Sequence, residues 1–358
     1  MGEIAYLCPM IPSQNARSDL RTFWQAILIF LMLSIVVGCS DDDEAPVTAV
    51  LRPQVTVLFS PNALGDNGYN DRIYTGLVRA RVSRDLNLEI LVPNSNAEAD
   101  SMLVEWLDAY TAGTTPRLLV FASDEYEALA RRYAARLPQT AKDRTLLFES
   151  TATDLPVATF AMPAYGACYR AGLLTAIWDE QPRCIIVSAN DYSLFLREAR
   201  QAFADGFEKV WGLRPDSCAL ADDFSGYYMA DSLQRMAEGW NGRYNLVFPI
   251  VGGSVSGLSN YLLTNFTIDL KVVGMDNYET YYYTPFYVVK HIDDVVRQCG
   301  GQWADGAELP RGARYGLASG RTEVVVEELW LTDEQRALVG PTLTEALQKE
   351  SEYEQTAP

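Results

Sequence analysis

Residues 245–275 read NLVFPIVGGSVSGLSNYLLTNFTIDLKVVGM and contain a complete strand–helix–strand unit. Apolar residues run almost without interruption over 245–251 and again over 271–275, which predicts two strands that are buried on both faces. Between them, after Gly252-Gly253, the apolar residues of 258–265 have helical spacing. Buried strands joined by a helix are typical of parallel sheets, so this stretch indicates an α/β fold.

The same alternation of strand and helix fills most of the chain from residue 53 onward. A first set of strands is predicted at 54–60, 88–92, 118–122, 146–149 and 157–160. A second set, after Pro182, is predicted at 184–189, 218–224, 245–251, 271–275 and 287–291. Two sets in series predict two doubly wound parallel-sheet lobes joined by a hinge. The segments 314–317 and 324–329 belong to neither set, and we expect them to return across the hinge.

These patterns divide the chain into six parts. They are a lipoprotein signal peptide (1–38), an acidic tether (39–52), an N-terminal α/β lobe (53–180), a C-terminal α/β lobe (181–286), hinge crossovers and return segments (287–330), and a C-terminal helical tail (331–358).

The N-terminal segment has the features of a targeting signal. An apolar run of 15 residues, FWQAILIFLMLSIVV at 23–37, follows Arg17 and Arg21, and it is short for a membrane span. It ends in Val36-Val37-Gly38-Cys39, which resembles the lipobox of bacterial lipoproteins. That resemblance implies that Cys39 becomes the lipidated first residue, carrying palmitate, of the mature chain. A membrane-anchoring helix that happens to contain a cysteine is the alternative.

The acidic run Ser40-Asp41-Asp42-Asp43-Glu44 follows the cysteine directly. It resembles the tag that sends some Gram-negative lipoproteins to the outer leaflet of the outer membrane. We therefore expect a protein that is lipid-anchored in the outer membrane and exposed at the cell surface. If the run is only a solvated spacer, the alternative is an anchor that faces the periplasm.

Charge and composition exclude several classes of function. Lys and Arg number 29 against 47 Asp and Glu, a net charge of −18, so binding to nucleic acid is not expected. The only histidine is His291, which leaves little room for histidine-based catalysis, and no cysteine or histidine spacing is typical of a metal site. We expect a protein that is not an enzyme and has no cofactor. Cys184 and Cys218 open predicted neighbouring strands, and both a disulfide and free thiols remain open for them.

Ligands of doubly wound folds bind at the carboxyl ends of the strands, here in the cleft between the lobes. Polar, aromatic or glycine residues follow most of the predicted strands. The candidate ligand-binding residues are Asp66, Tyr69, Asn70, Ser123, Asp124, Asn190, Tyr227, Gly252, Gly253, Asp276 and Lys290.

Four of these loops resemble motifs of the basic membrane protein family, whose members are substrate-binding lipoproteins of the type I periplasmic fold. Residues 65–70 (GDNGYN) resemble its D-K-S-F-N motif, and 247–253 (VFPIVGG) resemble V-I-F-P-V-A-G-G. Residues 273–276 (VGMD) resemble V-I-G-V-D, and 289–293 (VKHID) resemble V-K-R-V-D. Some members bind purine nucleosides. The chain departs from the family at Asn67, where the motif has lysine, and at Asn277-Tyr278-Glu279.

The resemblance implies roles for individual residues. Asp276 and Lys290 occupy the family's positions for the ribose hydroxyls, and a charged pair suits that task in a closing cleft. Tyr69 and Tyr227 occupy the positions of the aromatic rings that hold the purine, although Phe224 or Tyr228 also fits the second position.

Structural alternatives exist for most of the candidates. Asn70, Ser123, Asp124 and Asn190 are also suited to helix capping, Gly252 and Gly253 to a tight turn, Asp276 to a turn, and Lys290 to an exposed edge strand. The aromatic run at 278–287 (YETYYYTPFY) is either interlobe packing or a wider stacking surface.

The expected function is that of a membrane-anchored solute-binding lipoprotein, which closes two lobes on a small polar ligand for uptake through an ABC permease. A purine nucleoside is the preferred ligand, and a sugar on the same fold is the alternative. A surface-exposed ligand-sensing or interaction lipoprotein is a second alternative. An enzyme built around Lys290, His291 and Asp293 is the third.

Overall fold

The computed structural model describes residues 52–276 and 283–356. The signal peptide (1–38), Cys39, the acidic run at 40–44 and nearly all of the tether lie outside the described residues, as do residues 278–282 of the aromatic run. Among the described residues, no helix is both long and apolar enough to span a membrane.

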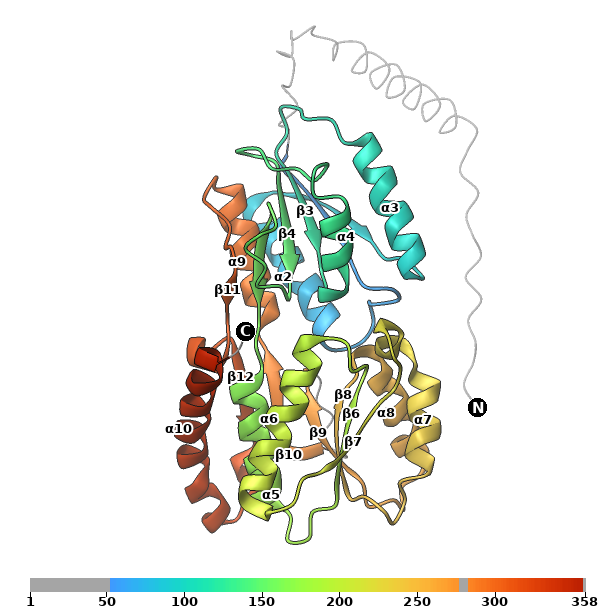
Figure 1. The fold of residues 1–358 in the computed structure, drawn as a ribbon, viewed down its shortest axis with the longest axis vertical. Helices are drawn as coiled ribbons and strands as arrows, with labels where there is room; N and C mark the ends of the chain where they lie inside the picture. Colours follow the sequence, from blue (N-terminus) through green and yellow to red (C-terminus); the bar gives the residue numbers. More distant parts are fainter. Residues whose placement is uncertain (1–51, 277–282, 357–358) are drawn as a thin grey trace, which may run out of the picture. The chain divides into compact units, whose positions relative to one another are not determined.

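The N-terminal lobe is built on a six-stranded parallel sheet with the order β11-β5-β4-β3-β1-β2 (Figure 1). Its strands are β1 (Gln54–Leu58), β2 (Asn87–Leu91), β3 (Arg117–Phe121), β4 (Arg144–Phe148), β5 (Ala158–Ala161) and β11 (Ala313–Arg314). One face packs on α2 (Tyr69–Arg84) and α9 (Ile292–Ala304), and the other on α3 (Asn96–Ala109) and α4 (Glu127–Arg132). The strands β1, β3 and β4 are mainly apolar and buried because both of their faces are covered, whereas the edge strand β2 (NLEIL) is partly exposed.

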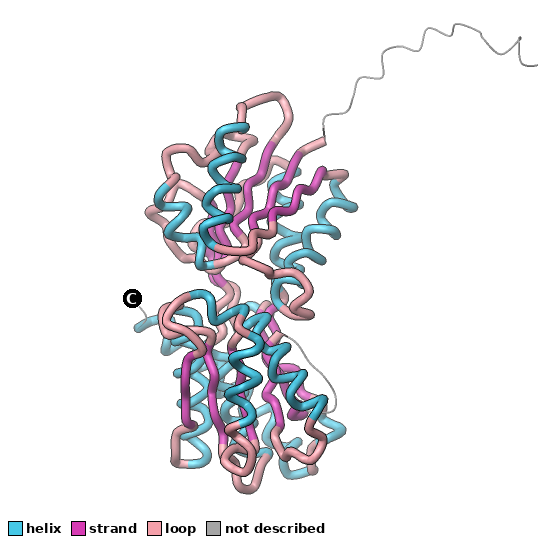
Figure 2. The backbone as a smooth tube through the Cα atoms, turned by 90° about the vertical axis from the view of Figure 1, so that its right-hand side faces the viewer, coloured by secondary structure: helices cyan, strands magenta, loops and turns pink. Residues whose placement is uncertain are grey.

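The C-terminal lobe repeats this plan with the order β12-β10-β9-β8-β6-β7, in which β12 alone is antiparallel. Its strands are β6 (Cys184–Ser188), β7 (Asp216–Ala219), β8 (Leu246–Ile250), β9 (Lys271–Met275), β10 (Tyr283–Lys290) and β12 (Thr322–Val326). The helices α5 (Tyr165–Trp178) and α6 (Leu194–Trp211) cover one face, and α7 (Ala230–Glu238) and α8 (Val255–Thr264) cover the other. Figure 2 shows both sheets between their helices from the side.

The helices α5 and α6 pack backbone against backbone. A Cβ atom on Gly206 would lie 2.0 Å from the Tyr169 carbonyl oxygen, and one on Gly172 would lie 2.1 Å from the Phe203 carbonyl oxygen. Only glycine allows so close an approach. On its other side α5 contacts the long C-terminal helix α10 (Asp333–Thr356).

The described chain crosses between the two sheets at three places. The first crossing leads from β5 to α5, the second from β10 to α9, and the third from β11 to β12. The second and third crossings are joined by a hydrogen bond from the His291 amide to the Arg321 carbonyl (2.8 Å). Because α9 and β11 complete the N-terminal lobe, both lobes depend on chain segments that pass through the hinge.

Cys184, the first residue of β6, and Cys218, the third residue of β7, are both free thiols. In the parallel register, Cys218 lies opposite Val187, whereas Cys184 is the first residue of β6. The strand positions therefore keep Cys184 and Cys218 apart, and the disulfide left open by the sequence is not formed.

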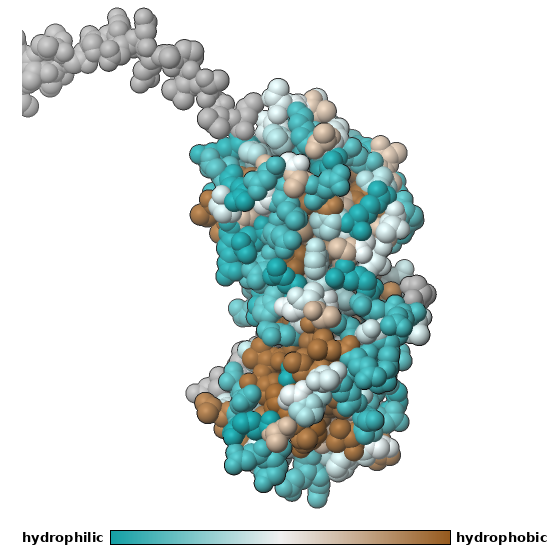
Figure 3. Space-filling view, turned by 90° about the vertical axis from the view of Figure 1, so that its left-hand side faces the viewer, coloured by the Kyte–Doolittle hydropathy of each residue, from teal (hydrophilic) through white to brown (hydrophobic). Residues whose placement is uncertain are grey.

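On one side of the molecule the two lobes differ in surface polarity. Figure 3 shows a broad apolar area on one face of the C-terminal lobe, where the same face of the N-terminal lobe is mostly polar. Exposed apolar side chains of this lobe include Leu329, which is 92% exposed, and Leu338 on α10.

Candidate functional site

A cavity of about 330 Å³ lies between the lobes at the carboxyl ends of both sheets. Every candidate from the sequence except Asn190 lines it: Asp66, Tyr69, Asn70, Ser123, Asp124, Tyr227, Gly252, Gly253, Asp276 and Lys290. The topology explains this convergence, because loops that follow parallel strands emerge at one edge of each sheet and the two edges face each other.

Lys290 at the end of β10 is the central charge of the cavity. Its Nζ lies 2.9 Å from Glu149 Oε1, and the two side chains are only 4% and 7% exposed. The same ammonium lies 4.2 Å from the ring centroid of Tyr69 and 4.0 Å from that of Phe195, both within the range of a cation–π interaction. Burial lowers the pKa of Lys290, but the carboxylates of Glu149 and Asp276 outweigh it and raise the pKa above its ordinary value. Lys290 is therefore a buried ammonium that links residues of both lobes.

Glu149 is the main site residue that the sequence did not single out. It follows β4 directly, with a left-handed φ of 55°, and its carboxylate also accepts hydrogen bonds from the Tyr69 hydroxyl (2.8 Å) and the Met162 amide (2.9 Å). Asp276, after β9, has a similar φ of 60°, and its Oδ1 accepts from the Lys290 amide at 2.8 Å. Non-glycine residues in this region are strained, and such strain gathers at functional sites.

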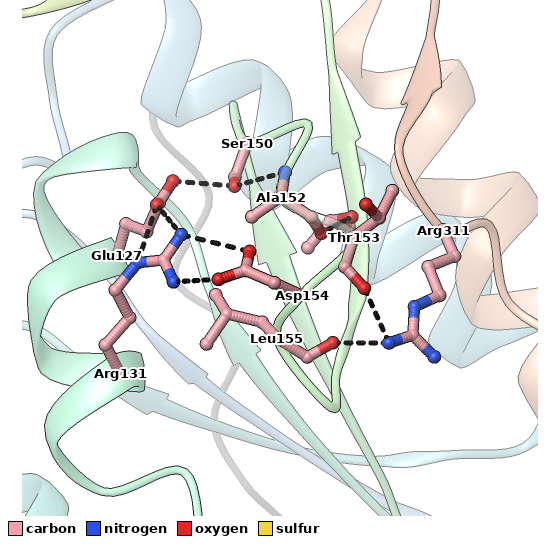
Figure 4. Close-up of polar contacts among 9 residues, drawn as sticks. Glu127, Arg131, Ser150, Ala152, Thr153, Asp154, Leu155 and Arg311 are labelled. Atoms are coloured by element: carbon pink, nitrogen blue, oxygen red, sulfur yellow. Dashed lines mark hydrogen bonds and ion pairs between the residues drawn. The ribbon is translucent and has the colours of Figure 1, made fainter.

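The loop that begins with Glu149 is fixed by charged side chains (Figure 4). Arg131 on α4 pairs with Glu127 at 2.7 Å and with Asp154 of the loop at 2.6 Å. Arg311 donates to two backbone carbonyls of the same loop, both at 2.8 Å. These contacts are half exposed and individually weak, but together they restrict the loop from which Glu149 projects.

Asp66 organises the start of α2. Its carboxylate accepts hydrogen bonds from the amides of Gly68 (2.8 Å), Asn70 (3.0 Å) and Asp71 (3.2 Å), and from Asn70 Nδ2 (3.0 Å). A negative charge is favoured at a helix N-terminus, where amides lack partners. Asn70, which the sequence offered as either a ligand contact or a cap, is the second residue of α2, and the capping carboxylate belongs to Asp66.

Asp124 contacts the opposite lobe through a hydroxyl group. Ser193 Oγ, at the start of α6, donates to Asp124 Oδ2 at 2.6 Å. Burial raises the pKa of Asp124, and the hydrogen bond from Ser193 acts in the opposite direction. Ser123 accepts from the Glu125 amide at 3.3 Å, so it caps the short helix η1 (Asp124–Tyr126) as the structural alternative predicted.

Asn190 does not line the cavity. It is 1% exposed, and its Oδ1 accepts from the amides of Tyr192 (2.9 Å) and Ser193 (2.8 Å). The side chain shapes the turn between β6 and α6, which agrees with the capping alternative. Asn190 thus bears on the cavity through Ser193, which it places opposite Asp124.

Tyr227, like Phe195 and Tyr228, is an aromatic residue of the C-terminal lobe that lines the cavity. Its ring lies against Phe224 at 6.2 Å between centroids and 24° between planes. Gly252 has a φ of +54°, and a Cβ there would lie 3.0 Å from Tyr227 Cδ1, so glycine permits both the turn and the ring position. Tyr228 also lines the cavity, whereas Phe224 packs against Tyr227 without lining it.

The residues proposed for an enzymatic site have separate partners. His291 Nε2 lies 2.7 Å from Glu323 Oε1, Asp293 pairs with Arg79 at 2.7 Å, and neither His291 nor Asp293 lines the cavity. Within 52–276 and 283–356, no group of three or more histidine, cysteine or acidic residues has the geometry to hold a metal ion. Of the aromatic run, Tyr283 and Phe286 pack into the two cores of the C-terminal lobe.

Comparisons with known sequences match only a small part of the chain. No family model matches the sequence. Over 78 residues the chain is 30% identical to an uncharacterized lipoprotein of Pyrococcus abyssi, and this match spans 22% of the chain and only 19% of that protein.

Solved structures match over most of the chain. An ABC transporter solute-binding protein of Aeropyrum pernix has a TM-score of 0.65 at 16% identity, covering 83% of this chain and 92% of its own. A transcriptional activator of the comK gene from Bacillus halodurans has a TM-score of 0.60 at 16% identity, covering 82% and 98%. A 5-methylthioribose-binding transporter protein of Thermotoga lettingae has 0.57 at 11% identity, covering 81% and 93%. The expected fold class is confirmed: the chain has the two-lobed α/β fold of type I periplasmic binding proteins.

Proposed function

We propose that the chain is a solute-binding lipoprotein whose two lobes close on a small polar ligand. The observation that carries the proposal is the cavity between the lobes, which combines a buried ammonium with several carboxylates and aromatic rings. No covalent step is part of the proposal. Affinity would come from desolvated hydrogen bonds, ring contacts and closure of the lobes.

The charges of the cavity suit a ligand rich in hydroxyl groups. Burial raises the pKa of Asp124 and of Asp276, so each carboxylate is costly to keep charged without a donor. Ligand hydroxyls that donate to these oxygens would replace lost water, and a charge-assisted hydrogen bond is about twice as strong as a neutral one. A vicinal diol, as in ribose, offers two such donors on adjacent carbons.

A purine nucleoside is the ligand we prefer. Asp276 and Lys290 would hold the ribose, while the ring of Tyr227 would contact the base from the C-terminal lobe. The motifs that resemble the basic membrane protein family support this assignment, and so does their convergence on one cavity.

A sugar is the second candidate, and one observation favours it. Lys290 Nζ already lies over the ring of Tyr69 at 4.2 Å, so that face of the ring is occupied. A base held between Tyr69 and Tyr227 would require Lys290 to move. A sugar needs hydroxyl partners on the carboxylates and only one ring to lie against.

The location of the protein is a separate part of the proposal. Cys39 would carry the lipid anchor, the acidic run at 40–44 would place the protein at the outer membrane, and an ABC permease would take the ligand onward. A surface-exposed sensor is the alternative, because a protein outside the outer membrane does not reach an inner-membrane permease. Protease treatment of whole cells separates the two: digestion supports surface exposure, and protection supports a periplasmic orientation.

Thermal unfolding of the purified protein with a panel of nucleosides, bases and sugars tests the ligand proposal. A ligand at a hundredfold excess over its dissociation constant adds about 2.7 kcal/mol of stability. We expect inosine, adenosine or guanosine to raise the unfolding temperature, and Asp276→Ala to abolish the rise. Glu352→Gln, an exposed change on α10, serves as the matched control. A rise with sugars alone would support the second candidate, and no rise with any compound would contradict both.

The anchor is tested by metabolic labelling with palmitate. We expect label in the full chain and none in Cys39→Ser, which should leave the membrane fraction. Equal labelling of both proteins would contradict the assignment of Cys39.

A further inference from the structure

A buried carboxylate on the C-terminal helix contacts the hinge. Glu350 of α10 is 2% exposed. Its Oε1 accepts from the Leu317 amide and its Oε2 from the Ala318 amide, each at 2.8 Å. Leu317 and Ala318 lie in the crossing between β11, in the N-terminal sheet, and β12, in the C-terminal sheet. One side chain thus satisfies two consecutive backbone amides of the hinge.

Two glycines bring the hinge backbone close to this carboxylate. A Cβ on Gly316 would lie 2.5 Å from Glu350 Oε1, and a Cβ on Gly166 would lie 2.9 Å from Glu350 Cβ. Gly166 is the second residue of α5, which receives the chain from β5 of the N-terminal lobe. Glu350 therefore sits where two of the three described crossings meet.

The neighbouring residues of α10 strengthen the same junction. Tyr353 stacks on Tyr165, with 4.0 Å between ring centroids and 12° between planes. Glu354 pairs at 3.1 Å with Arg314, which belongs to β11 in the sheet of the N-terminal lobe. Figures 1 and 2 both show the C-terminal end of α10 at the level of the crossings. The helix packs on α5 of one lobe while its last turns contact the strand of the other.

We propose that Glu350 is a positioning residue for ligand binding, which holds two hinge crossings in the geometry that they have in this structure. The C-terminal helix then sets the balance between closed and open lobes from outside the cavity, because Glu350 does not line it. The effect of Glu350 on ligand binding rests on the proposed function, but its effect on the separation of the lobes does not.

The physical reason is the number of donors that one carboxylate satisfies. A change in the angle between the lobes requires the crossings to change their backbone dihedrals. With Glu350 in place, such a change separates two amides from a buried acceptor, and unsatisfied buried amides are costly. Glu350→Gln keeps one acceptor but turns an amide donor toward the second N–H, so one hydrogen bond is lost.

The test measures lobe separation without ligand. Spin labels are placed on Ser101→Cys of α3 and Gln201→Cys of α6, two exposed positions on different lobes. The partly exposed free thiol Cys218 is replaced by serine, and electron–electron distances are recorded for the full chain. We expect Glu350→Gln to move the distribution toward longer distances and to speed hydrogen exchange of the Leu317 and Ala318 amides by about tenfold. Glu352→Gln, whose carboxylate pairs with Lys349 on the exposed side, should change neither.

A second variant covers a failure of Glu350→Gln to fold. Arg314→Gln removes the link to Glu354 at a partly exposed position and should lengthen the same distance to a smaller extent. Faster amide exchange with an unchanged lobe distance in either variant would overturn the proposal, because Glu350 would then act on local packing alone. A changed distance in a protein that binds no compound of the ligand panel would support the hinge role and refute the proposed function.

Discussion

Replacing Glu149 with glutamine removes one half of the ion pair that joins the lobes. The carboxylate lies 2.9 Å from Lys290 Nζ, and both side chains are almost fully buried. Glutamine has nearly the same shape, so the change isolates charge from packing. The Lys290 ammonium would remain in the cavity with the rings of Tyr69 and Phe195 and with the more distant charge of Asp276.

The size of the effect follows from this remaining environment. Removing one partner of a buried ion pair costs about 3–5 kcal/mol, because the other charge loses its compensation. Two aromatic faces offset part of the loss, since a desolvated cation–π contact contributes up to about 2 kcal/mol. We therefore expect the free energy of unfolding to fall by about 3 kcal/mol, the lower end of the range.

The loss in free energy of unfolding is measured by urea unfolding of a double-mutant cycle. The cycle contains Glu149→Gln, Lys290→Met and the double variant, in which neither charge is buried alone. We expect the double variant to cost about 2 kcal/mol less than the sum of the single variants. A loss below about 1 kcal/mol for Glu149→Gln, with additive single effects, would refute the view that this pair fixes the lobes.

Three further outcomes follow from the described geometry. Asp276→Asn should leave the ligand-free protein as stable as the wild type or more stable in thermal unfolding, while abolishing ligand-induced stabilisation. Asparagine tolerates the left-handed φ of 60° and still accepts a hydrogen bond from the Lys290 amide. A large loss of stability without ligand would contradict this expectation. Gly206→Ala should lower the free energy of unfolding in urea by about 3 kcal/mol or more, since its Cβ would lie 2.0 Å from a carbonyl oxygen. Gly340→Ala in α10 has open space around its Cβ and should stabilise the protein by up to about 1 kcal/mol. Equal effects of the two variants would disprove the close packing of α5 and α6. Burial raises the pKa of Glu125 from 4.5 to about 7, so its contribution to stability is complete below pH 4.5 and is lost as the pH rises through 7. Glu125→Gln should therefore flatten the dependence of stability on pH between these two values. An unchanged slope in the variant would argue against the raised pKa.

The fold was predictable because buried parallel strands leave a strong signal. The runs that form β1, β3, β6 and β8 are mainly apolar, and the structure has strands at each of them. Boundaries were less accurate. The strand predicted at 218–224 ends at Ala219, and Asp223 accepts from the Ser225 amide at 2.9 Å to begin a short 3-10 helix. The strand predicted from 287 starts at Tyr283, because the apolar pattern continues through Pro285.

The candidate site was predictable only as far as topology and local motifs reach. Loops after parallel strands must meet at the cleft, which is why Asp66, Asp124 and Asp276 converge on one cavity. Glu149 carries no local signal, since a glutamate after a short strand is most often exposed. Its role depends on Lys290, 141 residues later, and on a backbone conformation that the sequence does not reveal.

The part played by α10 was also hidden in the sequence. The tail at 331–358 shows helical character, but nothing marks Glu350 among its many acidic residues. Its burial follows from glycines at 166 and 316, which lie far away in sequence and open space for the carboxylate. Long-range complementarity of this kind depends on the assembled hinge.

Isothermal titration of the purified protein with inosine, and in parallel with ribose and arabinose, tests the central claim most directly. Closure of the lobes on a ligand in the cavity predicts saturable 1:1 heat for the wild type, a negative heat-capacity change from buried surface, and loss of binding in Asp276→Ala. Binding that persists unchanged in Asp276→Ala, or the absence of saturable heat with inosine, ribose and arabinose alike, would contradict a ligand site in this cavity.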